Sequence, residues 1–546
     1  MMLKRVYNSQ SKTVTFAAVL LGLSALLSRL LGLLRDRLLA GRFGAGEELD
    51  IYFAAFRIPD FVYGILIIGG ISAVFLPVFS EYFHRDEKEA WRFASNVLNC
   101  FLILLVLICG VLFLLTPWLV DLIAPGFSPE QRDLAVSLTK IMFLSPILFG
   151  LSSVFSGVLH YFNRFMAYSL APVLYNLGII FGIVFLVPIF GLQGLAYGVV
   201  FGALMHWLFQ LPAARMSGFK YFAFLNWRHS GILRVFKLMI PRTLGTAAYQ
   251  LNLIVITAIA STLTAGSIAI FNFSNNLYYF PIGLIGVSFA VASFPVLSRS
   301  WAQGMKDKFL ETFSSAFRQI LFLIIPTSLL IFLLRAQIVR LVLGTGEFGW
   351  LETRLTAASL GLFCLGIFAG ALVPFLARVF YSFQDTKTPV VIGIVSMILN
   401  IIFAFSFVHL LGYANPFSQF MVNILKLQGI ESVGVVGLPL ALSLAIIFQF
   451  FLLLFFLKRK IVEIRLREIC YSFWKTVLGA ALLGFSTYFS LRFFSGIFDL
   501  QTFLGVFWQA LFSALIGTTV FLLTTYFLKS PELTSIKSAV LKQFCK

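Results

Sequence analysis

The sequence has few charged residues for its length, and this shortage excludes a soluble protein. Only 12% of its 546 residues are Asp, Glu, Lys or Arg, whereas 60% are hydrophobic. An ordinary soluble domain has roughly 25% charged residues. A chain of this length and composition does not stay in solution, so we predict an integral membrane protein.

The residue patterns of common enzymes and metal sites are also missing. None of the 5 cysteines belongs to a CxxC pair or a Cys/His cluster, and the 5 histidines are scattered along the chain. The sequence contains no HExxH, P-loop or GxSxG motif. The connections between apolar runs are too short for a large domain outside the membrane. We therefore expect no enzyme, no metal site and no cofactor.

The basic residues point to membrane topology rather than to nucleic acid. The net charge is +19, but its Lys and Arg residues lie in short connections between apolar runs. Cytoplasmic loops of membrane proteins carry such an excess. Most of these residues fall on the side of the N-terminus, which predicts that both termini are cytoplasmic. The first apolar run has no small-residue cleavage site after it, so we expect a retained span rather than a signal peptide.

Apolar runs long enough to cross a bilayer recur about fourteen times along the chain. The second run, residues 51–80, and the eighth, residues 266–297, are longer than a bilayer requires. Each contains a proline, Pro59 and Pro281, and several glycines. We expect both helices to bend or tilt at these positions.

An internal repeat links the second and the eighth run. Residues 71–91, ISAVFLPVFSEYFHRDEKEAW, match residues 289–309, FAVASFPVLSRSWAQGMKDKF, so that Pro77 aligns with Pro295. An even number of spans separates the two copies, so both have the same orientation in the membrane. Parallel repeats of this kind occur in transporters that have two lobes.

Together these features predict an all-α membrane fold with a parallel pseudo-two-fold repeat around a central cavity. The N-terminal lobe, about six spans, would cover residues 1–230. The C-terminal lobe, also about six spans, would cover residues 231–465. Residues 466–546 would hold two further helices and a cytoplasmic tail.

The first span carries charges that need an explanation. Its end reads SRLLGLLRDRLLAGRFGAGEELD over residues 28–50, and its charged residues are Arg29, Arg35, Asp36, Arg37 and Arg42. Arg29 and Asp36 share a helix face, so we predict that they pair and that Arg35 is free. Arg37 and Arg42 lie near the end of the span, so we expect them to reach the lipid headgroups. Arg35 could reach the headgroups in the same way, and this alternative stays open. A deep arginine is a candidate for function.

The second span adds three charged residues around its proline. Arg57 and Asp60 flank Pro59 and either pair with each other or point into a wet cavity where the helix breaks. Asp50 begins this span, and it either caps its own helix or faces the arginines of the first span.

The eighth span contributes amides instead of charges. Asn272, Asn275 and Asn276 lie there, and Gln250 and Asn252 lie in the seventh span. Such groups either join helices to one another or line a cavity. Because the guanidinium group matches phosphate oxygens, the arginines predict an anionic cargo carried on a lipid. They argue against a drug or cation antiporter, whose cavity is acidic.

Several stretches, in order, resemble the lipid II flippase family, MurJ (MviN), of the multidrug/oligosaccharidyl-lipid/polysaccharide exporter superfamily. They read SRLLGLLRD (28–36), FGAGEELDIYFAAFRIPD (43–60), SAVFLPVFSEY (72–82), NRFMAYSLAPVLYN (163–176), FPIGLIGVSFAVASFPVLS (280–298) and FYSFQDTKTPV (380–390). The resemblance implies a bacterial inner-membrane flippase for cell-wall synthesis and cell shape. Such a flippase moves the undecaprenyl-diphosphate-linked peptidoglycan precursor to the outer leaflet by alternating access, and its last two helices form a groove for the lipid tail.

The resemblance also implies roles for particular residues. The family's cavity arginines fall on Arg29 and Arg35, with Ser28 and Asp36 beside them, and Asp50 matches the family acid before the second helix. Arg57 and Asp60 fall on a basic residue and an asparagine of the family. We expect Arg29, Arg35, Arg57 and Ser28, with Asn272, Asn275 and Asn276, to bind the cargo. Asp36, Asp50 and Asp60 would restrain the arginines or respond to an ion.

The sequence also departs from the family pattern. Tyr63 stands where many members have an arginine, Asn275 and Asn276 where they have an Asp-Arg pair, and Tyr279 where they have a glutamate. Two alternatives therefore stay open: an exporter of another polyprenyl-linked oligosaccharide, and a non-transporting membrane scaffold. For a flippase we expect a membrane potential or ion gradient as energy source, and peptidoglycan synthesis proteins and membrane lipids as partners.

Overall fold

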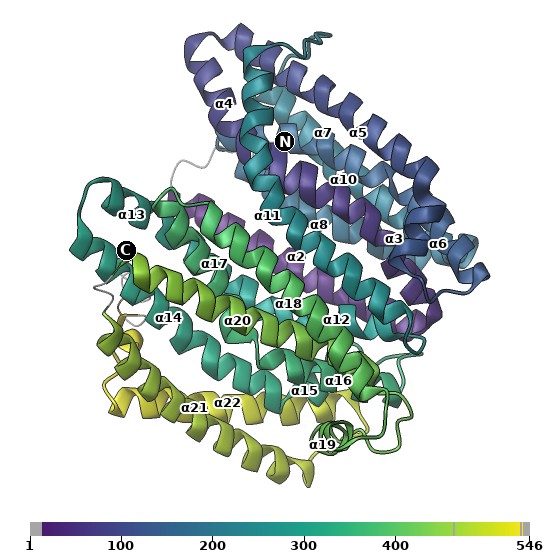
Figure 1. The fold of residues 1–546 in the computed structure, drawn as a ribbon, viewed down its shortest axis with the longest axis vertical. Coiled ribbons are helices and arrows are strands. Elements are labelled where there is room, and N and C mark those ends of the chain that lie inside the picture. Colours follow the sequence, from purple (N-terminus) through teal and green to yellow (C-terminus); the bar gives the residue numbers. More distant parts are fainter. Residues whose placement is uncertain (1–13, 462–464, 536–537, 539–546) are drawn as a thin grey trace. The chain divides into compact units, whose positions relative to one another are not determined.

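The fold is helical throughout the part of the chain that the structure describes. The structure is a computed structural model that describes residues 14–461, 465–535 and 538 (Figure 1). No strand occurs among these residues, so the all-α prediction is confirmed. The predicted N-terminal connection, residues 1–12, and Cys545 lie outside them. The chain divides into two compact units, unit 1 (Met1–Ala269) and unit 2 (Ile270–Lys546).

Unit 1 contains the helices up to α11. These are α2 (Val14–Phe43), α3 (Glu47–Val62), the π-helix η1 (Tyr63–Ile71), α4 (Ser72–Arg85), α5 (Glu87–Ile123), α6 (Pro129–Met142), α7 (Leu144–Tyr161), α8 (Phe165–Phe181), η2 (Gly182–Leu186), α9 (Val187–Phe190), α10 (Gln193–Met216) and α11 (Ser230–Ser261). The predicted boundary at residue 230 would place α11 in the second lobe. In the structure α11 packs along η1 and α3, so it belongs to unit 1. The division into lobes stays a prediction.

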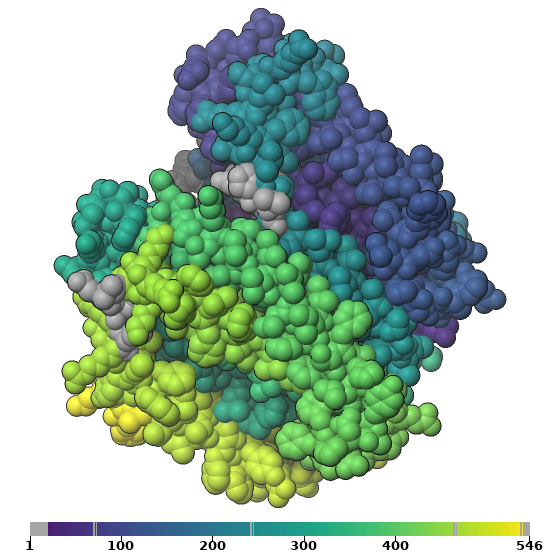
Figure 2. Space-filling model, viewed as in Figure 1, coloured from purple at the N-terminus to yellow at the C-terminus, as the bar shows by residue number. Residues whose placement is uncertain are grey.

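Unit 2 contains the remaining helices. These are α12 (Ser267–Pro281), whose first residues still belong to unit 1, the π-helix η3 (Ile282–Val287), α13 (Ser288–Ala302), α14 (Lys306–Leu333), α15 (Arg335–Val342), α16 (Trp350–Cys364), α17 (Ile367–Ser382), α18 (Lys387–Leu411), α19 (Pro416–Leu425), η4 (Gly434–Val436), α20 (Gly437–Lys460), α21 (Leu466–Ser495) and α22 (Phe503–Phe527). The last two helices pack against each other, and α21 also packs along α14 (Figure 1). Their yellow-green and yellow surface lies along one side of unit 2 in Figure 2.

The helices have the length and composition of membrane spans. Among the described residues, 11 helices are long and apolar enough to cross a membrane, or up to 13 if each of two bent pairs is one span. One bent pair is α16 with α17, at 48°, and the other lies within α11, at 53°. The helix α2, which carries the predicted first span, is not in this count. The structure thus agrees with a multi-span membrane fold.

Each copy of the predicted repeat has the same succession of elements. In unit 1, α3 contains Pro59, continues as η1 and then as α4, which contains Pro77. In the second copy, α12 ends at Pro281, continues as η3 and then as α13, which contains Pro295. A π-helical segment thus follows the proline in each of the two long runs, and π-bulges are frequent at functional sites. The bend or tilt of these helices stays a prediction.

Neighbouring side chains bond to two backbone carbonyls of α3 near its proline. Pro59 has no N–H, so the carbonyl of Ala55 loses its helical donor. Thr139 Oγ1 of α6 donates to Ala55 O at 3.2 Å, and Gln250 Nε2 of α11 donates to Asp60 O at 3.1 Å. The bond to Ala55 O replaces the missing donor, which no water can supply inside a membrane. Asp60 O also accepts from the Tyr63 N–H, so Gln250 adds a second donor there. These two bonds hold α3 against α6 and α11 near Pro59.

Candidate functional site

A row of polar side chains joins α2 to α8 in unit 1. Ser24 Oγ donates to Ser169 Oγ at 3.0 Å, and Asn176 Nδ2 donates to Ser28 Oγ at 3.2 Å. At the end of the row, Arg35 Nη1 donates to Asn176 Oδ1 at 3.4 Å. Polar groups between membrane helices hold them in register. The row thus fixes the arginine of α2 against α8, and Ser28 and Arg35 lie together as expected.

Arg35 is paired with a carboxylate. Its Nη2 and Nε lie 2.8 Å and 3.0 Å from Asp36 Oδ1. The Asp36 side chain is 4% exposed and that of Arg35 is 23% exposed. The prediction that Arg35 is free is therefore wrong. Helix geometry separates the Cβ directions of adjacent residues, but the long arginine side chain folds back across that angle. The predicted pairing of Arg29 with Asp36 stays a prediction.

Arg57 is buried and bonds to α11 rather than to its neighbour in α3. Its Nε donates to Thr257 Oγ1 at 2.7 Å, and the residue is 8% exposed. Among the described residues no Lys, Arg or His nitrogen lies within 4 Å of the half-buried Asp60 carboxylate. Of the two alternatives raised for these residues, the Arg57–Asp60 pair is therefore not formed. Arg57 instead ties α3 to α11 beside the break at Pro59.

Asp50 does not cap its own helix. The helix α3 begins at Glu47, and its cap position is Gly46. The buried Asp50 carboxylate accepts hydrogen bonds from the backbone N–H groups of Gly266 at 2.7 Å and Ala269 at 2.8 Å. These groups open the first turn of α12, whose N–H groups have no partner inside the helix. The prediction that Asp50 caps its own helix is therefore wrong. Its carboxylate instead caps the N-terminus of α12, which is distant in the sequence.

The amides of the eighth span lie on one face of α12. Asn272 and Asn276 are one helical turn apart, and Asn275 lies beside them; all three are half-buried. Ser274 is buried and donates to Ile270 O of its own helix at 2.7 Å. These asparagines belong to unit 2, whereas Arg29, Arg35 and Arg57 belong to unit 1. Their shared role with the arginines stays a prediction.

Sequence reasoning missed three residues that position the arginines and the broken helix. Asn176 had a signal, because it is an isolated amide within the apolar run that follows residue 165. Thr257 and Thr139 had none, because a threonine in a membrane helix usually bonds to its own backbone, and both of these do so as well. Only the packing of α6 and α11 on α3 shows their second partners.

The chemistry of this site suits an anion with several oxygens. A guanidinium group, an amide and a hydroxyl gather between α2 and α8, and a second buried guanidinium lies on α3. In the described part of the chain no three His, Cys, Asp or Glu residues are grouped as metal ligands. The site therefore offers hydrogen-bond donors to an anion, with one carboxylate close enough to balance the charge of Arg35.

A family model described as "Lipid II flippase MurJ" matches residues 39–507. The chain belongs to the MurJ family. It is 32% identical to the probable lipid II flippase MurJ of Vibrio cholerae over 447 residues, which are 78% of this chain and 84% of that protein. It is 31% identical to the Haemophilus influenzae protein of the same name over 503 residues, 88% of this chain and 94% of that protein.

A solved structure has the same fold. The structure of a lipid II flippase MurJ in an inward closed conformation superposes with a TM-score of 0.75 at 24% identity, covering 94% of this chain and 99% of that one. The resemblance inferred from the motifs is thus confirmed for the family and for the fold. The chain is a multi-pass membrane protein of a flippase family.

Proposed function

We propose that this protein is a lipid II flippase, which moves the undecaprenyl-diphosphate-linked peptidoglycan precursor from the inner to the outer leaflet by alternating access. The observation that carries this proposal is Arg35, held between Asp36 and Asn176 in a chain whose relatives are named lipid II flippases. A guanidinium at this position provides the paired donors that a diphosphate needs.

Asp36 explains how the site stays stable while it is empty. An unpaired arginine in a membrane helix is costly, and a neighbouring carboxylate lowers that cost. The Arg35 side chain remains 23% exposed, so part of the guanidinium stays accessible to cargo. In the proposed cycle the diphosphate binds Arg29, Arg35 and Arg57 beside Ser28, and Asp36 takes Arg35 back on release. Binding remains reversible because the arginine always has an anionic partner.

The rest of the cargo meets other parts of the chain. In this proposal Asn272, Asn275 and Asn276 contact the sugar or the peptide, and the polyprenyl tail stays in the bilayer along α21 and α22. Asp50 and Asp60 complete the acidic set that restrains the arginines or responds to an ion, and a membrane potential or ion gradient drives the cycle. The protein lies in the bacterial inner membrane with both termini cytoplasmic, works with peptidoglycan synthesis proteins, and carries out no catalytic step.

Rescue of a cell depleted of its own flippase tests the proposal. The wild-type chain, Arg35→Ala and the control Arg42→Ala are expressed at equal levels, and the access of the precursor headgroup to the outer surface is measured. Arg42 is exposed near the end of α2, so its loss leaves transport intact. We expect rescue by wild type and by Arg42→Ala but not by Arg35→Ala. Full rescue by Arg35→Ala, or failure of well-expressed wild type, would contradict the proposal.

A further inference from the structure

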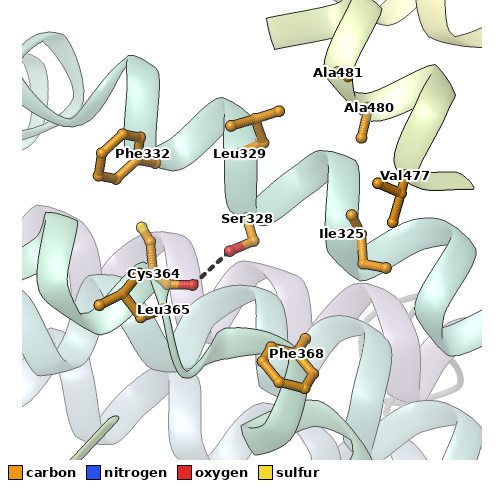
Figure 3. Close-up of a pocket in the computed structure, with 10 residues that line it drawn as sticks. All are labelled: Ile325, Ser328, Leu329, Phe332, Cys364, Leu365, Phe368, Val477, Ala480 and Ala481. Carbon is orange, nitrogen blue, oxygen red and sulfur yellow. Dashed lines mark hydrogen bonds between the residues drawn. The ribbon is translucent and has the colours of Figure 1, made fainter. Parts of the chain in front are cut away.

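Unit 2 contains an apolar cavity where α14, α21 and the bend between α16 and α17 meet. Its volume is about 460 Å3. The residues that line it are Ile325, Ser328, Leu329, Phe332, Cys364, Leu365, Phe368, Val477, Ala480 and Ala481 (Figure 3). All three elements belong to helices with the composition of membrane spans. The cavity therefore lies where the surrounding solvent is lipid.

Comparison of the two repeat copies shows how the cavity arises. The repeat places Ile325, Leu329 and Phe332 of α14 at the positions that Leu107, Val111 and Leu114 have in α5. Those α5 side chains are 61%, 56% and 78% exposed. In unit 2, α21 covers the corresponding face of α14. It does so with Val477, Ala480 and Ala481, which are too small to fill the space beneath them.

The polar atoms of the cavity are already satisfied. Ser328 Oγ donates to Cys364 O at 2.7 Å, as Figure 3 shows. This carbonyl lies at the end of α16, where the chain bends by 48° before α17 and the helical ladder is interrupted. The remaining lining consists of alkyl, aromatic and thiol groups. Such a cavity offers nothing to a polar ligand and suits a hydrocarbon chain.

A cation contacts one of the residues that line the cavity. The Arg335 guanidinium stacks on the Phe332 ring, 4.8 Å from its centroid, and Nη1 donates to Phe332 O at 2.7 Å. Gly361 of α16 leaves room for the arginine stem, because a Cβ there would lie 3.0 Å from Arg335 Cδ. Among the described residues no carboxylate lies within 4 Å of this guanidinium. An anion is therefore the missing partner of Arg335.

We propose that this cavity binds a membrane phospholipid with an anionic phosphodiester headgroup, one acyl chain in the cavity and the phosphate on Arg335. An apolar cavity with the Arg335 guanidinium against one of its lining rings matches the two parts of such a lipid. The site is formed by residues of unit 2 alone, and the inference does not depend on flippase activity. A bound lipid of this kind would fill the space between α14 and α21 and stabilise the packing of the last two helices on unit 2.

Retention of lipid by the purified protein tests this inference. The full chain in detergent is incubated with phosphatidylglycerol or with phosphatidylcholine of the same chains, and bound lipids are counted by native mass spectrometry. Arg335→Gln removes the charge, and Ala481→Phe fills the cavity from its exposed side. Arg340→Gln on α15 and Leu482→Phe on α21 are the matched controls, because neither residue lines the cavity. Thermal unfolding in detergent verifies that each variant is folded.

We expect one retained phosphatidylglycerol in wild type and in both controls, with about tenfold weaker binding in Arg335→Gln and in Ala481→Phe. Arg335→Lys retains binding, because it keeps the charge. Equal retention of the two lipids, or unchanged binding in folded Arg335→Gln, would overturn the inference. A third arm adds a polyprenyl diphosphate, and displacement of the phospholipid by this competitor would show that the cavity belongs to the cargo tail instead. Each of these results is independent of the rescue experiment.

Discussion

The second helix of each repeat copy continues through the same succession of elements but carries different chemistry. In α3 the residues around the break include Arg57 and Asp60, and their repeat-related positions in α12 are Asn275 and Tyr278. Both helices nevertheless continue as a π-helix and then as an α-helix of similar length. In both units a proline thus precedes the π-helical segment, whereas at these two positions only unit 1 carries charge. The two repeat copies thus share the order of their helices but differ in the side chains that those helices carry.

The partners of the two π-helices differ as well. η1 packs along α11, where Gln250 Nε2 would lie 2.1 Å from a Cβ on Gly64. η3 packs along α17, where Ala371 O would lie 2.5 Å from a Cβ on Gly286. Unit 1 therefore places a flexible polar side chain against its bend, and unit 2 places a rigid backbone there. The first arrangement tolerates adjustment and the second does not.

Replacement of Arg57 by asparagine, the residue at the corresponding position of the second repeat copy, has the largest expected effect on transport. Arg57→Asn removes a buried cation and leaves Thr257 without its donor. In the proposed cycle Arg57 also binds the cargo diphosphate. A hydrogen bond to a charged group is worth about 1.5–3 kcal/mol, so the loss of this contact should lower the flipping rate about 10- to 100-fold. Asn275→Ala, the change at the matching position of α12, should cost only a few-fold. Flipping by reconstituted protein measures both, and equal losses would show that the two copies share the task evenly.

Alanine at the two glycines tests the difference in packing. Gly286→Ala forces a methyl group against the backbone of α17, and overpacking of this kind costs about 1–3 kcal/mol. Gly64→Ala meets the Gln250 side chain, which can rotate away but then loses its hydrogen bond to Asp60 O, so we expect a smaller cost of about 1 kcal/mol. The apparent unfolding temperature in detergent compares them. The interpretation fails if Gly64→Ala unfolds at the lower temperature.

Thr257 supplies a smaller and more specific test. Thr257→Val removes the hydroxyl that accepts from Arg57 and keeps the shape of the side chain. We expect a loss of about 1–3 kcal/mol in stability, because a buried donor of Arg57 loses its acceptor. Thr257→Ser retains the hydroxyl and serves as the control. Unfolding curves of the two variants should separate, and coincident curves would mean that another acceptor replaces Thr257.

The ion pairs outside the spans give the smallest expected effect. Burial raises the pKa of Asp385, but hydrogen bonds from Lys460 and Thr388 outweigh it and hold that pKa below its usual range. A lowered carboxyl pKa contributes stability above the unfolded value, and this stability is lost as pH falls through the folded value. In Asp385→Asn the stability, measured as the unfolding temperature at a series of pH values, should therefore fall slightly less on acidification than in wild type.

An exposed ion pair in unit 1 provides the comparison for that profile. Glu81 and Arg234 form an exposed pair in which a hydrogen bond from Arg234 lowers the pKa of Glu81. Exposed pairs contribute little because water and salt screen them. Glu81→Gln should change the profile less than Asp385→Asn. A larger change in Glu81→Gln would reverse the expected order of the two units.

The sequence was sufficient for the helices, the repeat and the family, because these depend on hydropathy, on prolines and on quoted motifs such as residues 43–60. It was not sufficient for the partners of the charged groups. The face angle of a helix places Arg29 above Asp36, but it does not record how far the Arg35 side chain reaches. The contact of Asp50 with the start of α12 and that of Arg57 with Thr257 join residues far apart in the chain, and no local pattern encodes them.

The contact between Asp50 and the start of α12 also has a consequence for the biogenesis of the protein. Asp50 and Gly266 are 216 residues apart. A nascent chain that ends after α11 contains this carboxylate but neither of its two backbone donors. The hydrogen bonds of Asp50 in unit 1 therefore form only after the first turn of α12 has been synthesised.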